Sequence, residues 1–552
     1  MNMRTLIVLM MPAVTAMQCK KNDGTPQTPP AFRFIGMTVN GASSDFTVNN
    51  SNLHPEIKIT FSDAVNDASI GDAVSFASNQ PETVSYSATL EGNKSVLVIS
   101  PVNDLKGFTK YSVKISKALL SANAQPLSEP IAISLQTAMD STDKFPRISD
   151  DELLDLVQKQ TFKYFWDFAH PVSGLARERN TSGDIVTSGG SGFGIMSIVV
   201  AASRGFITKE EALTRMQKIV GFLKNTAQTF HGAYPHWLNG DTGEAVPFSD
   251  KDDGADLVET SYLMQGLLTA RQFFDGASAG ETTLRNDING IWNGVEWDWF
   301  RNNGQDVLYF HWSPNFDWQM NFPIREWNEC LITYVLAASS SDHSIPKSVY
   351  DNGWAQGGAM ANNSTYYGIT LPLGPAFGGP LFFAHYSFLG LDPRGLKDAY
   401  ANYWTQNTAH AMINYKYCVD NPKGYAGYSS SVWGLIASDD NNGYAAHGPD
   451  NDLGVISPTA ALAAFSYTPQ QSMDALKFFY YKLGDRIWKD YGFVDAFNLN
   501  VPWFANSFLA IDQGPIIVMI ENYRSGLLWD LFMSCPEVKN GLTNLGFQSP
   551  HL

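Results

Sequence analysis

Between about residues 31 and 138, hydrophobic and polar residues alternate in short runs that are separated by Gly, Asn, Asp and Pro. The runs are FRFIGMTVNG, PEIKITFSDAV, TVSYSATLEG, KSVLVISP, KYSVKIS and IAISLQT. A period of two is typical of strands with one buried face. About seven such strands in roughly a hundred residues predict an immunoglobulin-like β-sandwich over 31–138.

The pattern changes to a helical period after the polar stretch MDSTDKFPR, which we interpret as a linker at 139–147. Ser149 and Glu152 form a capping-box pattern before the first helix, and Thr208 and Glu211 repeat it before another. Thr468, followed by Pro469 and by Gln471, predicts a third helix start of the same kind.

The predicted helices are of two kinds. Some are amphipathic and charged, whereas others, such as GIMSIVVAAS and PTAALAAF, are apolar nearly all round and are expected to be buried. Roughly a dozen helices that alternate between these kinds predict an inner ring wrapped by an outer ring, an (α/α)6 barrel over 148–552. Long loops at 228–254, 304–325, 358–394 and 421–457 are expected to build a pocket at one end.

The first residues are typical of a secretory signal. Arg4 precedes an apolar run from Leu6 to Val14, and small residues follow before Cys19. We expect a signal peptide of the lipoprotein type at 1–19, a flexible tether at 20–30, and a periplasmic or outer-membrane location. The only membrane contact expected is a lipid anchor at Cys19, because no later segment has the ~20 consecutive apolar residues that span a bilayer.

Composition narrows the function classes. The 552 residues carry a formal charge of -17 with a pI near 5.0, and the sequence has no basic stripe, which argues against nucleic acid as a partner. The four cysteines lie far apart without a metal-binding spacing, so neither a metal nor another cofactor is predicted. Aromatic residues make up 13% of the chain, which suits a ligand with stackable rings such as a sugar.

Three carboxylates stand where buried helices are predicted to begin. Glu259 and Glu329 share a face with apolar residues three, four and seven positions later, and Asp512 precedes the apolar run from Ile516. A helix dipole stabilises a first-turn carboxylate by only ~0.3–1 kcal/mol, so each acid alone could be structural. Several acids at one rim favour hydrolysis of a glycosidic bond, which needs one protonated and one ionised carboxyl group.

Five long phrases give a more specific indication. SGGSGFGIMSIVVAASRGFITKEEA, DDGADLVETSYLMQGLLTARQFF, EWNECLITYVLAAS, SPTAALAAFSYTP and IDQGPIIVMIENYRSGLLWDLFM resemble the glucoamylase-like domain of Bacteroidetes secreted enzymes, the group that contains glycoside hydrolase family 144. PEIKITFSDAV is similar to the bacterial Ig-like modules that precede such enzymes. The resemblance implies a metal-independent, inverting hydrolase of β-1,2-glucan or its oligosaccharides, of either endo or sophorose-releasing type.

Residue roles follow from the same resemblance. It implies that Glu329 is the general acid and that Asp252 and Glu259 are further essential acids, with Asp512 a candidate on the base side. Two alternatives stay open, because Asp253 adjoins Asp252 and Glu326 lies one turn from Glu329.

Loop residues are expected to contact the substrate. The aromatic candidates are Trp237, Trp312, Trp318, Trp433 and Trp503, and the polar candidates are Arg177, His385, His447 and Arg524. Any of these could instead be a core or structural residue. The competing functions are hydrolysis of another glucan linkage and glycan capture by a non-catalytic lipoprotein, since a barrel fold does not fix the reaction.

Overall fold

The computed structural model describes residues 30–552, so the predicted signal peptide, Cys19 and most of the predicted tether lie outside the described residues. The chain divides into two compact units, Met1–Asp140 and Ser141–Leu552, which are described separately. Among the helices of residues 30–552, none combines the length and the apolar character that crossing a bilayer requires.

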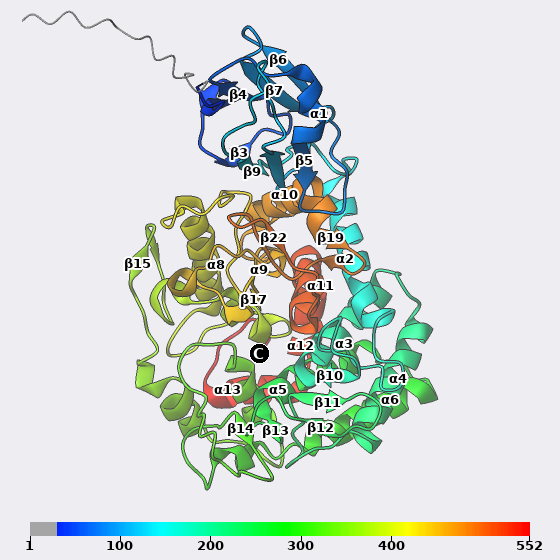
Figure 1. Cartoon of the computed structure of the whole chain (residues 1–552). Helices are drawn as coiled ribbons and strands as arrows, with labels where there is room; N and C mark the ends of the chain where they lie inside the picture. Colours follow the sequence, from blue (N-terminus) through cyan, green and yellow to red (C-terminus); the bar gives the residue numbers. More distant parts are fainter. Residues whose placement is uncertain (1–29) are drawn as a thin grey trace, which may run out of the picture. The chain divides into compact units, whose positions relative to one another are not determined.

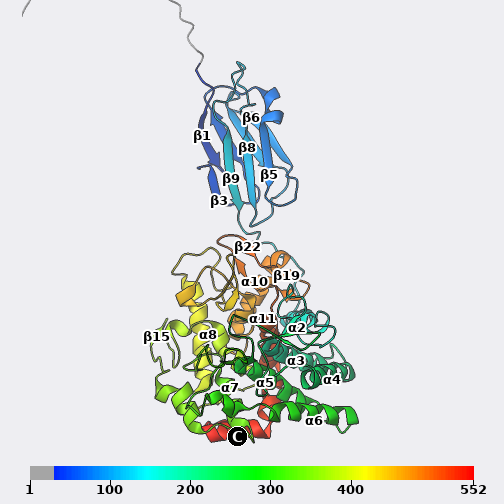
Figure 2. The same ribbon diagram turned by 60° about the horizontal axis from the view of Figure 1, so that its bottom comes forward.

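The first unit is a sandwich of two sheets (Figure 2), which confirms the predicted immunoglobulin-like class. One sheet has the order β2-β1-β4-β7-β6, with bounds Ala42–Ser43, Phe34–Val39, Ile57–Phe61, Val96–Pro101 and Tyr86–Glu91. The other has the order β3-β9-β8-β5, with bounds Thr47–Ser51, Ile131–Thr137, Lys110–Ile115 and Val74–Ser78. Strand β3 runs parallel to β9, and the other pairings are antiparallel. A short helix α1, Ile70–Ala73, precedes β5.

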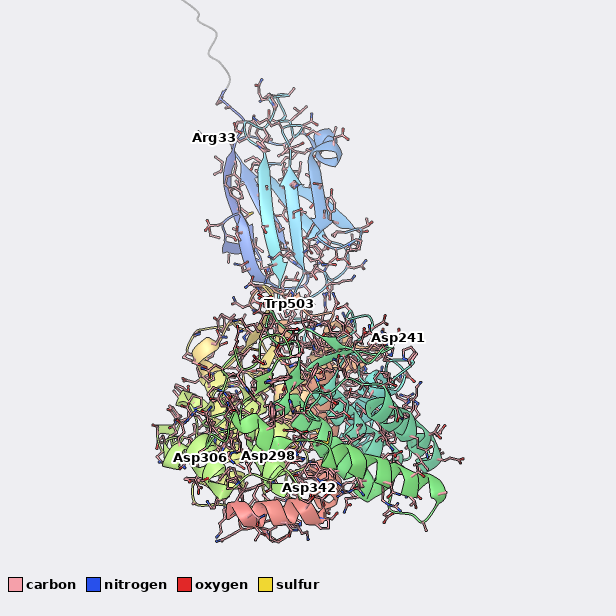
Figure 3. All side chains as sticks on the ribbon, turned by 90° about the horizontal axis from the view of Figure 1, so that it is seen from below. Arg33, Asp241, Asp298, Asp306, Asp342 and Trp503 are labelled. Carbon is pink, nitrogen blue, oxygen red and sulfur yellow. The ribbon has the colours of Figure 1, made fainter. Side chains whose placement is uncertain are left out.

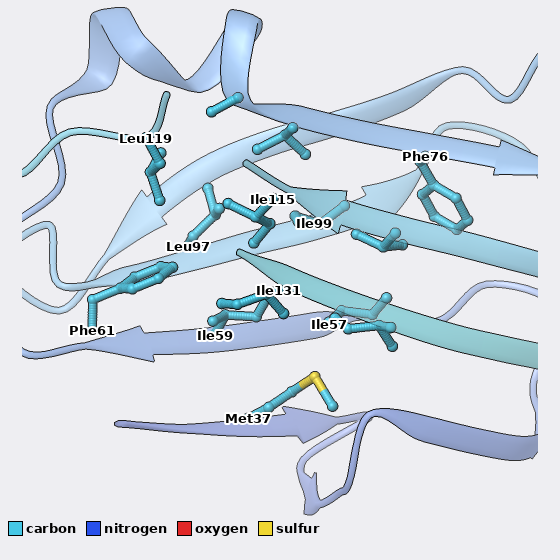
Figure 4. Packing of buried hydrophobic residues seen from close by; sticks show 14 of the residues in the cluster. Met37, Ile57, Ile59, Phe61, Phe76, Leu97, Ile99, Ile115, Leu119 and Ile131 are labelled. Atoms are coloured by element: carbon cyan, nitrogen blue, oxygen red, sulfur yellow. The ribbon is translucent and has the colours of Figure 1, made fainter. Parts of the chain in front are cut away.

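The sandwich core follows from the period-two pattern. Ile57 and Ile59 on β4 face Leu97 and Ile99 on β7, with Ile131 of the second sheet across from them (Figure 4). Because alternate residues of a strand point to opposite faces, these side chains fill the space between the sheets while their neighbours lie on the outer faces.

The second unit is the predicted helical barrel, with outer helices alternating with buried inner elements along the chain. The outer helices are α2 Asp150–Trp166, α4 Lys209–Asn225, α6 Ala279–Asn293, α8 Tyr403–Asp420 and α10 Pro469–Ile487. The inner elements are α3 Ser188–Ser203, α5 Leu257–Phe273, α7 Leu331–Ser339, the 3-10 turns η6 Leu381–Ala384 and η7 Tyr386–Phe388, α9 Pro458–Leu462 and α11 Ala510–Arg524. Helices α12 Leu527–Met533 and α13 Pro536–Leu545 end the chain.

The inner elements form a ring. Helix α3 packs on both α5 and α11, α5 packs on α7, α7 contacts η7, and α9 contacts α11. The hydroxyl of Tyr467, just after α9, donates to the carbonyl of Ala384 in η6 and links the remaining neighbours. Helices α4 and α6 lie at the periphery of this unit in both views (Figures 1 and 2). One inner position is therefore held by 3-10 turns instead of a full helix.

The helix starts test the capping patterns. Ser149 and Thr208 make complete capping boxes with Glu152 and Glu211, as predicted. The third capping box is wrong, because the Thr468 side chain makes no cap bond and its Oγ1 instead contacts the Ala464 carbonyl and the Ser472 hydroxyl. Pro469 still begins α10, since its fixed φ suits the first helical turn.

Candidate active site

A cavity of about 370 Å³ opens where the leading ends of the inner helices meet. Thr187, Glu259, Glu329 and Ile511 line it, and they stand at or just before the first turns of α3, α5, α7 and α11. Aromatic side chains make up much of the remaining wall, namely Trp237, Phe248, Tyr262, Phe310, Phe382, Tyr386 and Tyr444. Two of the three predicted acidic helix starts, those of Glu259 and Glu329, therefore meet at this cavity.

Short strands position two of these helices. Strand β10, Ile185–Thr187, pairs with β11, Trp237–Asn239, and runs directly into α3, while β12, Ala245–Val246, completes that sheet. Strand β13, Ala255–Asp256, pairs with β14, His311–Trp312, and leads into α5. Because each strand ends at a helix start, the backbone amides of both first turns point toward the cavity end.

Glu259 is buried in the first turn of α5, where its Oε2 accepts hydrogen bonds from the Gly189 amide at 2.9 Å and from the Thr187 hydroxyl at 3.4 Å. Asp256 caps the same helix by accepting from the Glu259 amide at 2.9 Å. Burial raises the pKa of Glu259, whereas the nearby His236, the Gly189 amide and the Thr187 hydroxyl favour its ionised form. Glu259 is therefore held by donors from a neighbouring inner helix.

The sequence pattern predicts Glu329 in the first turn of a helix, but the residue lies two positions before α7 begins. Its backbone carbonyl accepts from the Ser387 hydroxyl at 2.5 Å and from the Tyr262 hydroxyl at 3.4 Å, which fixes this turn against η7 and α5. Burial, with Glu259 and Asp256 nearby, raises the pKa of Glu329 to about 7. A carboxyl group with that pKa is protonated over the mildly acidic range, as a general acid requires.

His236 joins the acids from the edge of the aromatic wall. Its Nδ1 lies 2.9 Å from Asp256 Oδ2, and its ring stacks on Phe248 with centroids 4.1 Å apart. Although burial lowers the pKa of His236, the nearby Glu259 and Asp256 outweigh it and raise the pKa to about 9. His236 is thus a cation beside the carboxylates, and no feature of the sequence pattern singled it out.

Asp252 and Asp253, adjacent in sequence, have different surroundings. Asp252 is buried outside the cavity lining, with its Oδ2 3.2 Å from His311 Nδ1. Asp253 accepts from the Ser313 hydroxyl at 2.5 Å and the Asn315 amide at 2.6 Å, so both of its oxygens brace a loop turn. Of the two, Asp252 is the one that lies near histidines, namely His311 and His236.

Asp512 does not line the cavity, although its neighbour Ile511 does. Its buried carboxyl faces Asp495, and burial together with that neighbour raises the pKa of Asp512 well above its usual range. Burial beside Asp495 favours the protonated form of Asp512, which is unfavourable for a base, and its role on the base side stays a prediction. The predicted helix start is correct, but the side chain points behind the cavity wall.

Arg179 and Glu178 complete the opposite wall. Arg179 donates to Glu178 at 3.0 Å and to Asp439 at 3.1 Å, and it is the only Lys or Arg lining the cavity among residues 30–552. The sequence prediction chose Arg177 instead, whose guanidinium donates to the Phe168 and Gly183 carbonyls and lies over the Phe168 ring. Arg177 is consequently structural.

Of the predicted stacking residues, Trp237 lines the cavity. Trp433 is fully buried and its indole N–H donates to the Gln471 carbonyl, so that prediction is wrong, because a core ring offers no face to a sugar. Trp312 and Trp318 lie outside the cavity lining, and so does Trp503, which is partly exposed on β22, Trp503–Phe504 (Figure 3).

The remaining polar candidates also lie outside the cavity lining. His385 and His447 are fully buried, and burial lowers the pKa of both. Arg524 pairs with Asp151 and Asp155 at the trailing end of α11. These residues were predicted as polar substrate contacts, and the alternative that each is a structural residue agrees with their burial and ion pairs.

Two groups of side chains in residues 30–552 could hold a metal ion by proximity, namely His236 with Asp252 and Asp256, and His170 with Asp184 and Asp241. In the second group the Val172 amide donates to His170 Nδ1, which leaves the proton on Nε2, the atom facing Asp184 at 3.3 Å. In the first group a proton between His236 and Asp256 already satisfies the pair. Asp252 of the first group differs, because its buried Oδ2 has no hydrogen-bond partner among the described residues, although it lies 3.2 Å from His311 Nδ1.

Comparisons with known proteins agree with this site. A family model described as "Putative glucoamylase" matches residues 321–536, and one described as "Bacterial Ig-like domain" matches residues 27–137. An endo-β-1,2-glucanase from Chitinophaga pinensis, solved with sophorotriose and glucose, is 53% identical with a TM-score of 0.72, over 74% of this chain and 100% of that one. A β-1,2-glucanase structure from Parabacteroides distasonis is 37% identical with a TM-score of 0.71, over 94% of this chain and 73% of that one.

A curated relative from Parabacteroides distasonis, an exo β-1,2-glucooligosaccharide sophorohydrolase acting at the non-reducing end, is 46% identical over 421 residues. The match covers 72% of this chain and 58% of the relative, so it spans somewhat more than half of that protein's length. Identity at this level over more than two thirds of the chain shows common descent, and the chain belongs to the bacterial glucoamylase-like family, here preceded by an Ig-like domain.

Proposed function

We propose that this protein hydrolyses β-1,2-linked glucan or its oligosaccharides, with Glu329 as proton donor and Glu259 as the second carboxyl group. One observation supports the proposal above the others: the two glutamates line one aromatic-walled cavity but have opposite surroundings. Besides Asp256, Glu259 has an amide, a hydroxyl and a charged imidazole near it, whereas the charged neighbours of Glu329 are acids and its donors are its own amide and the Cys330 thiol.

The division of protons follows from those surroundings. Two nearby carboxyl groups in a buried site do not both ionise readily, and the one with a cation beside it, here Glu259 with His236, ionises first. Glu259 is then the carboxylate and Glu329 the acid. Glu329 would give its proton to the glycosidic oxygen as the bond to the anomeric carbon breaks, while Glu259 would activate water at that carbon. We propose inversion, in line with the family resemblance.

The cavity also suits a neutral sugar. Phe248 and Tyr444 are about half exposed and line the cavity, which places flat rings at its mouth. Trp237 lies against Phe248 with centroids 4.9 Å apart. Apolar ring faces stack on the C–H faces of pyranoses, and the carboxylates and Arg179 offer partners for hydroxyl groups.

The test is to incubate the purified chain with linear β-1,2-glucan, sophoro-oligosaccharides, starch and laminarin and to follow the products by chromatography. Sophorose as the sole early product would indicate exo action, and a ladder would indicate endo action. Glu329→Gln should lose activity by at least about a hundredfold, while the exposed neighbour Glu326→Gln should keep it. Products from starch alone would refute the linkage, and tight binding without products would favour a capture protein.

We also propose that the protein is a lipoprotein of the cell envelope, anchored through Cys19. The support is the sequence pattern of Arg4, the apolar run and the cysteine that follows it.

A further inference from the structure

A second aromatic hollow, of about 330 Å³, lies on the helical unit away from the catalytic cavity. None of its lining residues lines that cavity. Its lining combines two indoles with carboxylates, an amide and an imidazole, from Glu296, Asp298, Trp299, Asn303, Trp318 and His343. Asp298 is labelled in Figure 3.

Trp299 is an exposed ring that is held in place. It lies in the 3-10 turn η2, Trp297–Arg301, and 41% of its surface is accessible. The His231 ring stacks on it with centroids 3.8 Å apart and an interplanar angle of 15°, and His231 Nδ1 is in turn 2.9 Å from Glu296 Oε2. Trp318 lies 6.3 Å away, tilted by 35°. An exposed large aromatic ring that is fixed in this way is typical of a binding surface.

The polar rim is also fixed. Asp298 Oδ1 lies 3.0 Å from His343 Nδ1. Asn302, Asn303 and Gly304 have successive φ values of 43°, 65° and 80°, and Arg301 clamps this turn through the Gly304 carbonyl at 2.8 Å. Left-handed backbone at two consecutive non-glycine residues is unfavourable, and such conformations concentrate where a loop must present groups to a ligand.

The two residues of strand β14 contact different groups of side chains. His311 points to the catalytic side, where its Nδ1 is 3.2 Å from Asp252. Trp312, the next residue, contacts His231 and Trp299 with centroid distances of 5.2 Å and 6.4 Å. Trp312 therefore packs beside the ring that lines the second hollow, and it is not part of the catalytic cavity lining.

We propose that this hollow is a non-catalytic binding site for the pyranose rings of a neutral glucan chain. Stacking on Trp299 and Trp318 would supply the contact area, and Glu296, Asp298 and Asn303 would accept or donate hydrogen bonds at hydroxyl groups. The described lining has carboxylates and no Lys or Arg, which disfavours anionic ligands. The site keeps a polymer attached while a different segment occupies the catalytic cavity; the choice of β-1,2-glucan as that polymer rests on the proposed function.

The test measures polymer binding and short-substrate catalysis separately. In the full chain carrying Glu329→Gln, migration through native gels containing linear β-1,2-glucan gives the affinity for the polymer. Adding Trp299→Ala and Trp318→Ala should weaken that affinity about tenfold, the size expected for losing stacking contacts. Tyr523→Ala is the matched control, because Tyr523 is 44% exposed on α11 and lies outside both hollows.

In the active background the double variant should hydrolyse sophorotetraose with kcat/KM unchanged within about twofold, and Trp299→Tyr should recover part of the polymer affinity. Unchanged polymer affinity would overturn the proposal, and so would a parallel loss on polymer and tetraose. Failure of the proposed function can be told apart from failure of this site. If the protein binds starch or laminarin instead of β-1,2-glucan, gels containing that glucan measure whether the two tryptophan substitutions weaken its binding. Absence of binding to every neutral glucan would also overturn the site.

Discussion

The close packing of Gly189 against Glu259 predicts that Gly189→Ala lowers the proposed hydrolase activity without replacing a carboxylate. An ideal Cβ at Gly189 would stand 2.3 Å from Glu259 Oε2, 2.8 Å from its Cδ and 3.0 Å from Tyr262 Cδ2. Unstrained contacts between such atoms need roughly 3.4–4 Å, so the Glu259 carboxyl must move by about 1 Å. The same movement strains the 2.9 Å hydrogen bond from the Gly189 amide.

A displacement of about 1 Å at a catalytic group can lower the rate by about a hundredfold, which corresponds to about 2.7 kcal/mol of activation free energy. We therefore expect kcat on sophoro-oligosaccharides to fall by about that factor. Overpacking should also lower the free energy of unfolding, by about 1–3 kcal/mol, so thermal unfolding must confirm that the variant is folded at the assay temperature.

Gly221→Ala is the matched control, because Gly221 lies in α4 and a Cβ there meets nothing within 4 Å. It should leave kcat unchanged and stabilise the helix by roughly 0.5–1 kcal/mol. Full activity of Gly189→Ala would refute the argument that Glu259 must stay where α3 holds it.

Five further predictions concern pH dependence, ring burial, metal dependence and membrane attachment. The rate kcat/KM should fall as pH rises through about 7, because Glu329 then loses the proton it donates. The melting temperature should also fall with rising pH, because both groups have raised pKa values in the folded protein. The stabilisation from Glu329 is present below pH 4.5 and is lost as the pH rises through about 7. The stabilisation from His236 is present below pH 6.5 and is lost as the pH rises through about 9. Glu329→Gln should flatten the first part of that profile, and an unchanged profile would contradict the assignment. Trp433→Ala should cost about 3–5 kcal/mol of unfolding free energy because the ring is fully buried, whereas Trp237→Ala should lower kcat/KM with little effect on the melting temperature. EDTA should leave activity unchanged if no metal takes part, and activity restored only by added metal would show otherwise. Cys19→Ala should move the protein from the membrane fraction to the soluble fraction after expression in a lipoprotein-processing host, and unchanged membrane association would refute the anchor.

The resemblance and the helix starts pointed to Glu259 and Glu329, which line one cavity in the structure, but several other predicted site residues do not line it, for one reason. Arg177 and Arg179 are two positions apart in the same loop segment, but only Arg179 lines the cavity. Asp512 begins the helix that the pattern predicts, but its carboxyl faces Asp495 behind the wall. A helical or strand period indicates which residues are buried, and it does not indicate whether a buried side chain meets a cavity or another element.

What the sequence determined by itself is the order of structural elements. Periods of two and 3.6 depend on which face of each element is apolar, and local capping depends on residues three apart, so strands, helices and most helix starts are readable along the chain. Three relations were decided by the tertiary structure alone. The Gly189 amide of α3 donates to Glu259 of α5, and His236 lies beside the acids with a raised pKa. Trp312 contacts the rings of the second hollow, whereas His311 lies next to Asp252. These relations join residues far apart in sequence, and the pKa values and the cavity result from burial and proximity that exist only once the ring of helices has closed.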